Sequence, residues 1–184
     1  MRQWLPAPIA ALALAACAHS PATTMLTLDA VAPAAAAPAY RGAPIAIPAV
    51  HIPAALDRAE YTRQVAGAEM KVDDFARWIA PLGTLARDTL VRDLTARLPE
   101  GAVLPPGAVA APPARTVSVT ILAFGIAGGQ ARMDVAYREL PSGPVAQLSL
   151  ETPQQAGTPT ASAEAFSQLL AQLADRMAAS LGRP

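Results

Sequence analysis

The chain has 184 residues, of which 14 are basic and 14 are acidic, so its formal net charge is zero. Cations are not clustered and aromatic residues make up only 4% of the chain, which argues against binding to nucleic acid or to an anionic membrane surface. One cysteine and two histidines leave too few ligands for a zinc site and no pair of thiols for an intramolecular disulfide. We therefore expect no metal ion and no cofactor.

The first 16 residues have the pattern of a bacterial lipoprotein signal peptide. Arg2 supplies positive charge, and the apolar run Trp4–Ala16 that follows is too short to span a bilayer. The tetrapeptide LAAC, which ends at Cys17, resembles a lipobox. This resemblance predicts cleavage between Ala16 and Cys17 and attachment of lipid to the Cys17 thiol; the alternative is a chance cysteine beside an ordinary Ala-x-Ala cleavage site.

The residue after the cysteine, Ala18, bears on the destination of the lipoprotein. Lipoprotein sorting in Gram-negative bacteria reads this position, and a residue that is not acidic resembles the signal for the outer membrane. A diacylglyceryl group with an amide-linked acyl chain gives stable anchoring. We expect a lipid-anchored protein of the outer membrane whose body faces the periplasm and contains no transmembrane helix.

Removal of residues 1–16 from 184 leaves 168, enough for one domain and a tail. Residues 18–42 are rich in Ala, Pro and Thr, which favours an extended spacer. Within the spacer, leucines and threonines alternate over Thr24–Asp29 and predict a short edge strand. The predicted organisation is a signal peptide over 1–16, lipidated Cys17 with a linker over 17–43, and one periplasmic domain over 44–184.

The domain begins with segments that alternate in the manner of strands. Residues 45–50 predict a strand at an edge or bulge, because Pro48 cannot donate a ladder hydrogen bond. Tyr61–Val65 and Glu69–Val72 flank a small-residue turn and predict a hairpin.

Two adjacent carboxylates, Asp73 and Asp74, follow this hairpin. Paired carboxylates can serve acid–base catalysis, but aspartate ahead of a short turn is more often a cap. We therefore expect a capped turn that carries Phe75 and Trp78.

Pro81 begins the clearest helix, which Pro99 and Gly101 end. Its apolar stripe predicts one buried face, formed by Leu82, Leu85, Ala86, Leu90, Val91, Leu94 and Leu98. Two acid–base pairs at i,i+4 spacing, Asp88 with Arg92 and Asp93 with Arg97, are expected on the solvent face.

A meander follows, with strands over Thr116–Ile126, Ala131–Tyr137 and Val145–Leu150 joined by glycine-containing turns. The last helix is expected to start with Ser162 as N-cap and to place Phe166, Leu169, Leu170, Leu173, Met177 and Leu181 on one side. The order of elements predicts an α+β fold, a single domain in which two main helices pack on one face of a mixed or antiparallel sheet.

No catalytic constellation is apparent in this pattern. His19 lies in the linker, and His51 lies on a proline-flanked strand without a GxSxG elbow. The stretch GIAGGQ from Gly125 has the wrong glycine spacing for a dinucleotide loop and joins two strands. We predict that the protein is not an enzyme.

Short motifs between residues 45 and 99 carry a resemblance to a known family. They are Ile52-Pro53, Leu56-Asp57-Arg58, Arg77-Trp78, Pro81-Leu82 and Leu98-Pro99. With them the chain resembles the auxiliary lipoproteins of ABC-type lipid transport systems, the PqiC-like family, over most of residues 24–181. It departs from the family pattern at Met25-Leu26, where tyrosines are usual, and at Ile79, where alanine is usual.

The resemblance implies a non-catalytic outer-membrane subunit of a system that moves lipids or other apolar compounds between two membranes. The implied partner is a periplasmic substrate-binding subunit of the mammalian-cell-entry type, and homo-oligomerisation is compatible with this role. Leu56, Arg58, Arg77, Trp78, Pro81 and Leu82 are then structural or partner-contacting residues, and for Arg77 and Trp78 we favour a snorkelling pair at the sheet edge over lipid contact. The alternative is an outer-membrane lipoprotein with a structural or wall-binding role.

Overall fold

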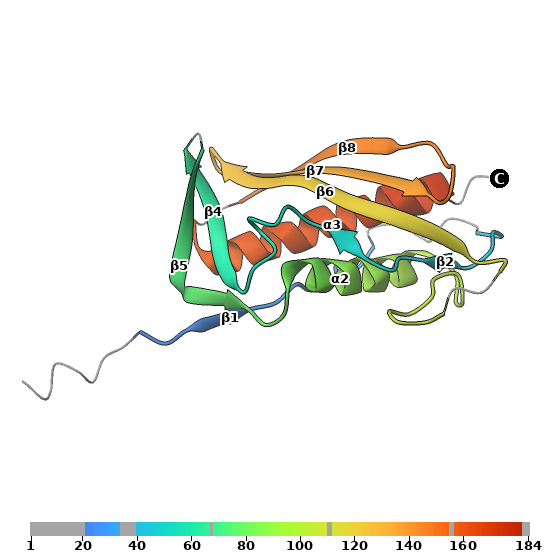
Figure 1. The fold of residues 1–184 in the computed structure, drawn as a ribbon, viewed down its shortest axis with the longest axis horizontal. Coiled ribbons are helices and arrows are strands. Elements are labelled where there is room, and N and C mark those ends of the chain that lie inside the picture. Colours follow the sequence, from blue (N-terminus) through green and yellow to red (C-terminus); the bar gives the residue numbers. More distant parts are fainter. Residues whose placement is uncertain (1–20, 34–39, 67, 110–111, 155–156, 182–184) are drawn as a thin grey trace, which may run out of the picture.

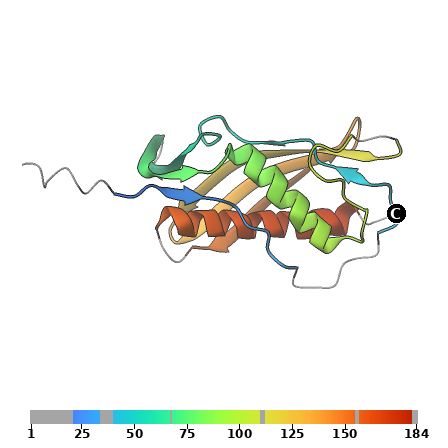
Figure 2. The same ribbon diagram turned by 90° about the horizontal axis from the view of Figure 1, so that it is seen from below.

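The computed structural model describes residues 21–33, 40–66, 68–109, 112–154 and 157–181. Two helices, α2 (Leu82–Arg97) and α3 (Pro159–Leu181), lie on the same side of the longer of two sheets (Figures 1 and 2). The strands are β1 (Thr24–Leu26), β2 (Ile45–Ala46), β3 (Val50–His51), β4 (Glu60–Ala66), β5 (Glu69–Trp78), β6 (Arg115–Ala127), β7 (Gln130–Glu139) and β8 (Ala146–Pro153). The fold is α+β and forms a single domain, as the sequence predicted.

The longer sheet is built on the predicted meander. Strands β6, β7 and β8 are antiparallel neighbours, and β2 and β3 both pair with β6 in parallel, which makes the sheet mixed. The turn between β6 and β7 uses Gly128 and Gly129 at φ of 59° and 76°, a conformation that side chains with a Cβ rarely adopt. The single strand predicted over 45–50 is divided in two, because Pro48 between β2 and β3 has no N–H to donate.

The shorter sheet has the order β1-β5-β4 and closes one end of the molecule (Figure 1). The short edge strand predicted near Thr24 is confirmed as β1, which pairs in parallel with β5 and brings Leu26 beside Trp78. Leu26 and Leu28 are 3% and 1% exposed. This segment, which the sequence analysis placed inside the spacer, therefore packs into the core.

The capped turn predicted at Asp73-Asp74 is wrong, because β5 continues through these residues to Trp78. Burial alternates along its end, with Ala76 and Trp78 buried and Phe75 exposed, as expected for a strand covered on one face. Asp73 Oδ1 accepts a hydrogen bond from the backbone N–H of Phe75 and so acts within the strand.

Helix α2 has the predicted limits and the predicted buried stripe. Of the two predicted surface ion pairs, that of Asp88 with Arg92 is wrong, and that of Asp93 with Arg97 forms but is not on the surface. Asp88 pairs with its neighbour Arg87, and Arg92 donates to the carbonyl of Leu28. Asp93 and Arg97 do form an ion pair, but both side chains are buried.

Helix α3 begins at Pro159, three residues before the predicted N-cap. The hydroxyl of Thr158 accepts a hydrogen bond from the backbone N–H of Ala161, which satisfies a donor of the first turn. Ser162 instead lies inside the helix, where its hydroxyl accepts hydrogen bonds from Tyr61 and Gln154.

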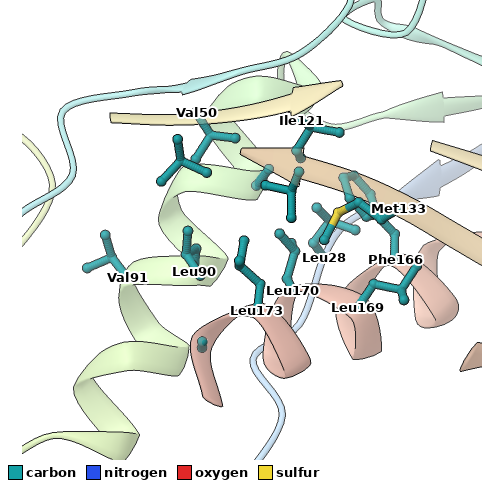
Figure 3. Packing of buried hydrophobic residues seen from close by; sticks show 14 of the residues in the cluster. Leu28, Val50, Leu90, Val91, Ile121, Met133, Phe166, Leu169, Leu170 and Leu173 are labelled. Carbon is teal, nitrogen blue, oxygen red and sulfur yellow. The ribbon is translucent and has the colours of Figure 1, made fainter. Parts of the chain in front are cut away.

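The core lies between the longer sheet and the two helices (Figure 3). Leu169, Leu170 and Leu173 of α3 and Leu90 of α2 face Val50, Ile121 and Met133 of the strands. Phe124 stacks on Phe166 with ring centroids 4.5 Å apart, an arrangement that adds to area burial. Within the described residues, no helix combines the length and the hydropathy that a membrane crossing requires.

Candidate functional site

The six family-motif residues lie around the corner where β5 passes into α2. Leu56, Trp78 and Leu82 are buried there, whereas Arg58, Arg77 and Pro81 are exposed. The backbone N–H of Trp78 donates to the carbonyl of Ala59 at 2.7 Å, which joins the loop before β4 to the end of β5. Pro81 has no N–H of its own and its carbonyl accepts from Thr84 and Leu85, so it starts the first turn of the helix.

Asp57, in the middle of the motif Leu56-Asp57-Arg58, caps this helix. Its Oδ1 accepts a hydrogen bond of 2.9 Å from the backbone N–H of Gly83, and a carboxylate at this position also complements the helix dipole. A Cβ on Gly83 would lie 3.0 Å from the carbonyl oxygen of Val50, so glycine permits close approach of the helix to β3. Sequence reasoning missed this cap because 26 residues separate Asp57 from Gly83.

Arg77 and Trp78 do not form the predicted snorkelling pair, because adjacent residues of a strand point to opposite faces. Trp78 points inward, 5% exposed, and its ring lies 6.2 Å from that of Tyr61. The Tyr61 hydroxyl donates to Ser162 of α3 at 2.6 Å. Trp78 thus connects the shorter sheet to the helices, while Arg77 lies on the outer face beside Glu60.

A buried polar cluster joins the N-terminal segment to both helices. Asp93 is fully buried, and its Oδ1 accepts a hydrogen bond of 2.8 Å from the backbone N–H of Val31. Arg97 donates from Nε to Asp175 of α3 at 2.6 Å and from Nη1 to the carbonyl of Val31 at 3.0 Å. Burial raises the pKa of Asp93 to about 6, against the opposing effects of the Val31 hydrogen bond and the Arg97 charge.

One oxygen in this cluster is unsatisfied. Within the described part of the chain, Asp93 Oδ2 is buried without a hydrogen-bond partner, which is costly for a carboxylate. The cluster therefore specifies the position of the N-terminal segment more than it adds stability.

A groove of about 590 Å³ lies where the β6–β7 hairpin approaches β4. Small residues of β6, which are Ala123, Gly125 and Ala127, stand opposite Asp134, Arg132 and Gln130 of β7 in the register. These positions face away from the helices, since Ala131 and Met133 between them are buried. The small size of Ala123, Gly125 and Ala127 leaves the groove open, and Phe124 and Ile126 complete its lining on β6.

Three lining residues of the groove, which are Arg132, Asp134 and Glu151, form a polar network with Ser149. Arg132 contacts Asp134 at 3.2 Å and Glu151 at 3.7 Å, and it donates to the Ser149 hydroxyl at 2.9 Å. The Ser149 hydroxyl donates to Asp134, and this bond, with the Arg132 charge, lowers the pKa of the Asp134 carboxyl. The groove therefore combines small apolar side chains with groups that can bind a polypeptide backbone.

The described residues offer little to metal or nucleophilic chemistry. In residues 21–33, 40–66, 68–109, 112–154 and 157–181, no group of three His, Cys, Asp or Glu side chains is placed to share a metal ion. His51 is exposed on β3. The predicted cleavage and lipid-attachment residues, Ala16 and Cys17, lie outside the described residues.

Two crystal structures have a similar fold. The structure of an uncharacterized protein gives a TM-score of 0.71 at 18% identity and covers 88% of this chain and 99% of its own. The structure of protein XCC0632 from Xanthomonas campestris, described as DUF330, gives a TM-score of 0.64 at 16% identity. The similarity covers 86% of this chain and 93% of that protein. No protein of curated function matches the sequence.

A sequence model of one family, described as the ABC-type transport auxiliary lipoprotein component, matches residues 26–178. The match begins in β1 and ends in α3, so it includes the buried N-terminal segment, all six motif residues and the groove. The predicted resemblance to PqiC-like proteins is confirmed, and the chain belongs to the ABC-type transport auxiliary lipoprotein family.

Proposed function

We propose that the protein is a non-catalytic lipoprotein subunit of the outer membrane that serves an ABC-type transport system of the mammalian-cell-entry class. The system would move lipids or other apolar compounds between the two membranes. The observation that carries this proposal is the family match over residues 26–178. The lipobox pattern that ends at Cys17 and the neutral Ala18 after it support an outer-membrane anchor.

The proposed partner is the periplasmic substrate-binding subunit of that transporter. Our candidate contact surface is the groove beside β6, because it is lined by apolar residues of β6, small ones together with Phe124 and Ile126, and by the charged residues Arg132, Asp134 and Glu151. A segment of a partner protein can bury such small side chains and exchange hydrogen bonds with the polar edge. In this arrangement the anchor holds the body at one membrane and the groove receives the partner.

The anchor is tested with Cys17→Ser, because a serine hydroxyl does not accept the diacylglyceryl group. We expect the variant to leave the membrane fraction after a salt wash, while the unchanged protein stays with outer membranes. A Cys17→Ser protein that still sediments with outer membranes would contradict the anchor.

The partnership is tested by a pull-down from detergent-solubilised envelopes with the lipidated protein as bait, read by mass spectrometry. We expect recovery of a transporter substrate-binding subunit, and loss of this recovery with Gly125→Phe, which fills the groove. Gln147→Phe is the matched control, because Gln147 is exposed on β8 of the same sheet and does not line the groove.

A deletion strain supplies an independent measurement. Loss of lipid transport should raise its sensitivity to detergents and apolar toxins. Recovery of only peptidoglycan or porins, together with an unchanged sensitivity, would favour the wall-binding alternative.

A further inference from the structure

The outer face of the shorter sheet carries a group of exposed apolar side chains. Met25, Phe75 and Ile79 are 57%, 47% and 56% exposed. The register places Met25 of β1 beside Arg77 of β5, and Phe75 and Ile79 lie two residues before and after Arg77 on the same face. The backbone N–H of Ile79 donates to Leu26, so the ladder extends past the end of β5.

These side chains are part of a wider concentration of exposed apolar surface. Among the described residues, nine large apolar side chains are prominently exposed, and five of them lie on β1, on β5 or directly after β5. The five are Met25, Met70, Val72, Phe75 and Ile79. The other four lie elsewhere, and apolar side chains exposed together on one small sheet mark an interaction surface.

The length of the chain before β1 indicates what this surface meets. Cys17 precedes Met25 by eight residues, which can span at most about 28 Å when fully extended. The opposite end of the molecule is farther away, since α3 alone, with 23 residues, is about 34 Å long and runs along the long axis (Figure 1). A lipid on Cys17 therefore holds the end that carries the shorter sheet close to the bilayer. This step rests on the anchor of the proposed function.

We propose that the outer face of the β1-β5-β4 sheet rests on the phospholipid surface to which Cys17 is anchored. Met25, Phe75 and Ile79 enter the boundary between headgroups and acyl chains, at a depth of about 5–10 Å. Arg77 lies among them, so its aliphatic stem packs along the apolar side chains while the guanidinium binds lipid phosphate. The body then stands with α3 directed away from the membrane.

The test uses site-specific fluorescence on the lipidated protein. The native thiol of Cys17 is consumed by the lipid, so a single introduced cysteine can be labelled with an environment-sensitive dye. Phe75→Cys reports on the proposed surface, and Val145→Cys is the matched control, because Val145 is also exposed, at 57%, and lies just before β8. Each labelled protein is reconstituted in vesicles of phosphatidylethanolamine and phosphatidylglycerol, with or without headgroup-proximal spin-labelled lipid.

We expect a blue shift of the dye at position 75 and loss of its emission with the spin-labelled lipid, and neither change at position 145. Adding Met25→Ser and Ile79→Ser should reduce the quenching at position 75, whereas Leu122→Ser and Leu140→Ser, which alter exposed leucines elsewhere, should leave it unchanged. Coincident thermal melts show that these variants remain folded.

Three outcomes would overturn the proposal, and they are distinguishable. Protein that stays on the vesicles with an unshifted dye at position 75 overturns the docking alone. Protection that arises only when the transporter subunit is added means that the face binds protein instead of lipid. Vesicles that float without protein overturn the anchor, and with it the docking.

Discussion

Helix α2 carries two aspartates that differ in their surroundings although each has an arginine four residues later. The Asp88 side chain is 41% exposed and pairs with Arg87 at 2.7 Å. Asp93, one and a half turns along, is fully buried with Arg97, which is 3% exposed. Asp88 thus forms a solvated pair with its neighbour on one side of the helix, whereas Asp93 and Arg97 form a buried pair at i,i+4 spacing on the other.

The difference comes from the N-terminal segment, which runs beside both helices (Figure 2). Val31 donates to Asp93 and accepts from Arg97, so the segment covers this side of α2 and removes water from the pair. The Asp88 side chain, by contrast, remains 41% exposed among the described residues. An acid–base pair at helical spacing is therefore a surface feature or a structural contact according to what packs on it.

The largest effect is expected from the buried apolar stripe of α2. Leu94→Asp should unfold the domain, with a loss of about 4 kcal/mol or more, because it creates a cavity and buries an unpaired charge. Leu94 is 0% exposed, as is Leu90, for which we expect the same result. Urea and thermal unfolding of protein that lacks residues 1–17 measure the loss, and a folded Leu94→Asp protein would mean that the helix faces are misassigned.

A smaller loss is expected when the buried cluster is broken. Arg97→Met should cost about 3 kcal/mol, because it leaves the Asp93 charge buried without a partner. Asp93→Asn is the matched control and should cost less, since its amide oxygen still accepts from Val31 and no charge is left unpaired. If the double variant is as unstable as the sum of the two single variants, Asp93 and Arg97 are not coupled.

The pH dependence of stability should report on the buried carboxyl of Asp93. Burial raises the pKa of Asp93 to about 6, above the ordinary value of about 3.9 expected in the unfolded chain. Between these two values the folded state binds more protons, so the stability due to this group falls as the pH rises from about 4 to about 6.

Melting temperatures of the unchanged protein and of Asp93→Asn, measured side by side over this range, isolate the effect from the other carboxylates. The melting temperature of the unchanged protein should fall relative to that of Asp93→Asn as the pH rises. A constant difference would show that the pKa of Asp93 is not raised in the folded protein.

The smallest effect is expected at the exposed pair. Asp88→Ala should change the stability by less than about 0.5 kcal/mol, because an exposed ion pair contributes little and alanine favours the helix. The same unfolding measurements apply, and a loss comparable to that of Arg97→Met would mean that Asp88 has a buried partner.

Local signals allowed much of the fold to be predicted. Pro81 and Leu98-Pro99 mark the ends of α2, and the two glycines between β6 and β7 mark a hairpin, because each signal acts within a few residues. The predictions were wrong where contact with a segment distant in the sequence determines the local structure. The strand β5 continues through Asp73-Asp74 because β1 pairs with its end, and α3 begins before Ser162, which instead binds Tyr61 of β4.

The candidate functional residues likewise divide into those that local sequence signals reveal and those that depend on distant contacts. The motif residues could be identified from the sequence, and their structural role is seen in Leu56, Trp78 and Leu82, which are buried at the β5–α2 corner. The cap by Asp57 and the groove beside β6 could not be predicted, because each joins residues that lie far apart in the chain.

The sequence by itself determined the helix and hairpin signals, the family resemblance and the expected lipid anchor at Cys17, since all of these are encoded in short contiguous stretches. Only the tertiary structure decided that Leu26 and Leu28 belong to the core and that Asp93 and Arg97 are buried. The physical reason is that burial depends on which segment covers a side chain. That segment lies about 60 residues away from α2 and leaves no mark in the local pattern.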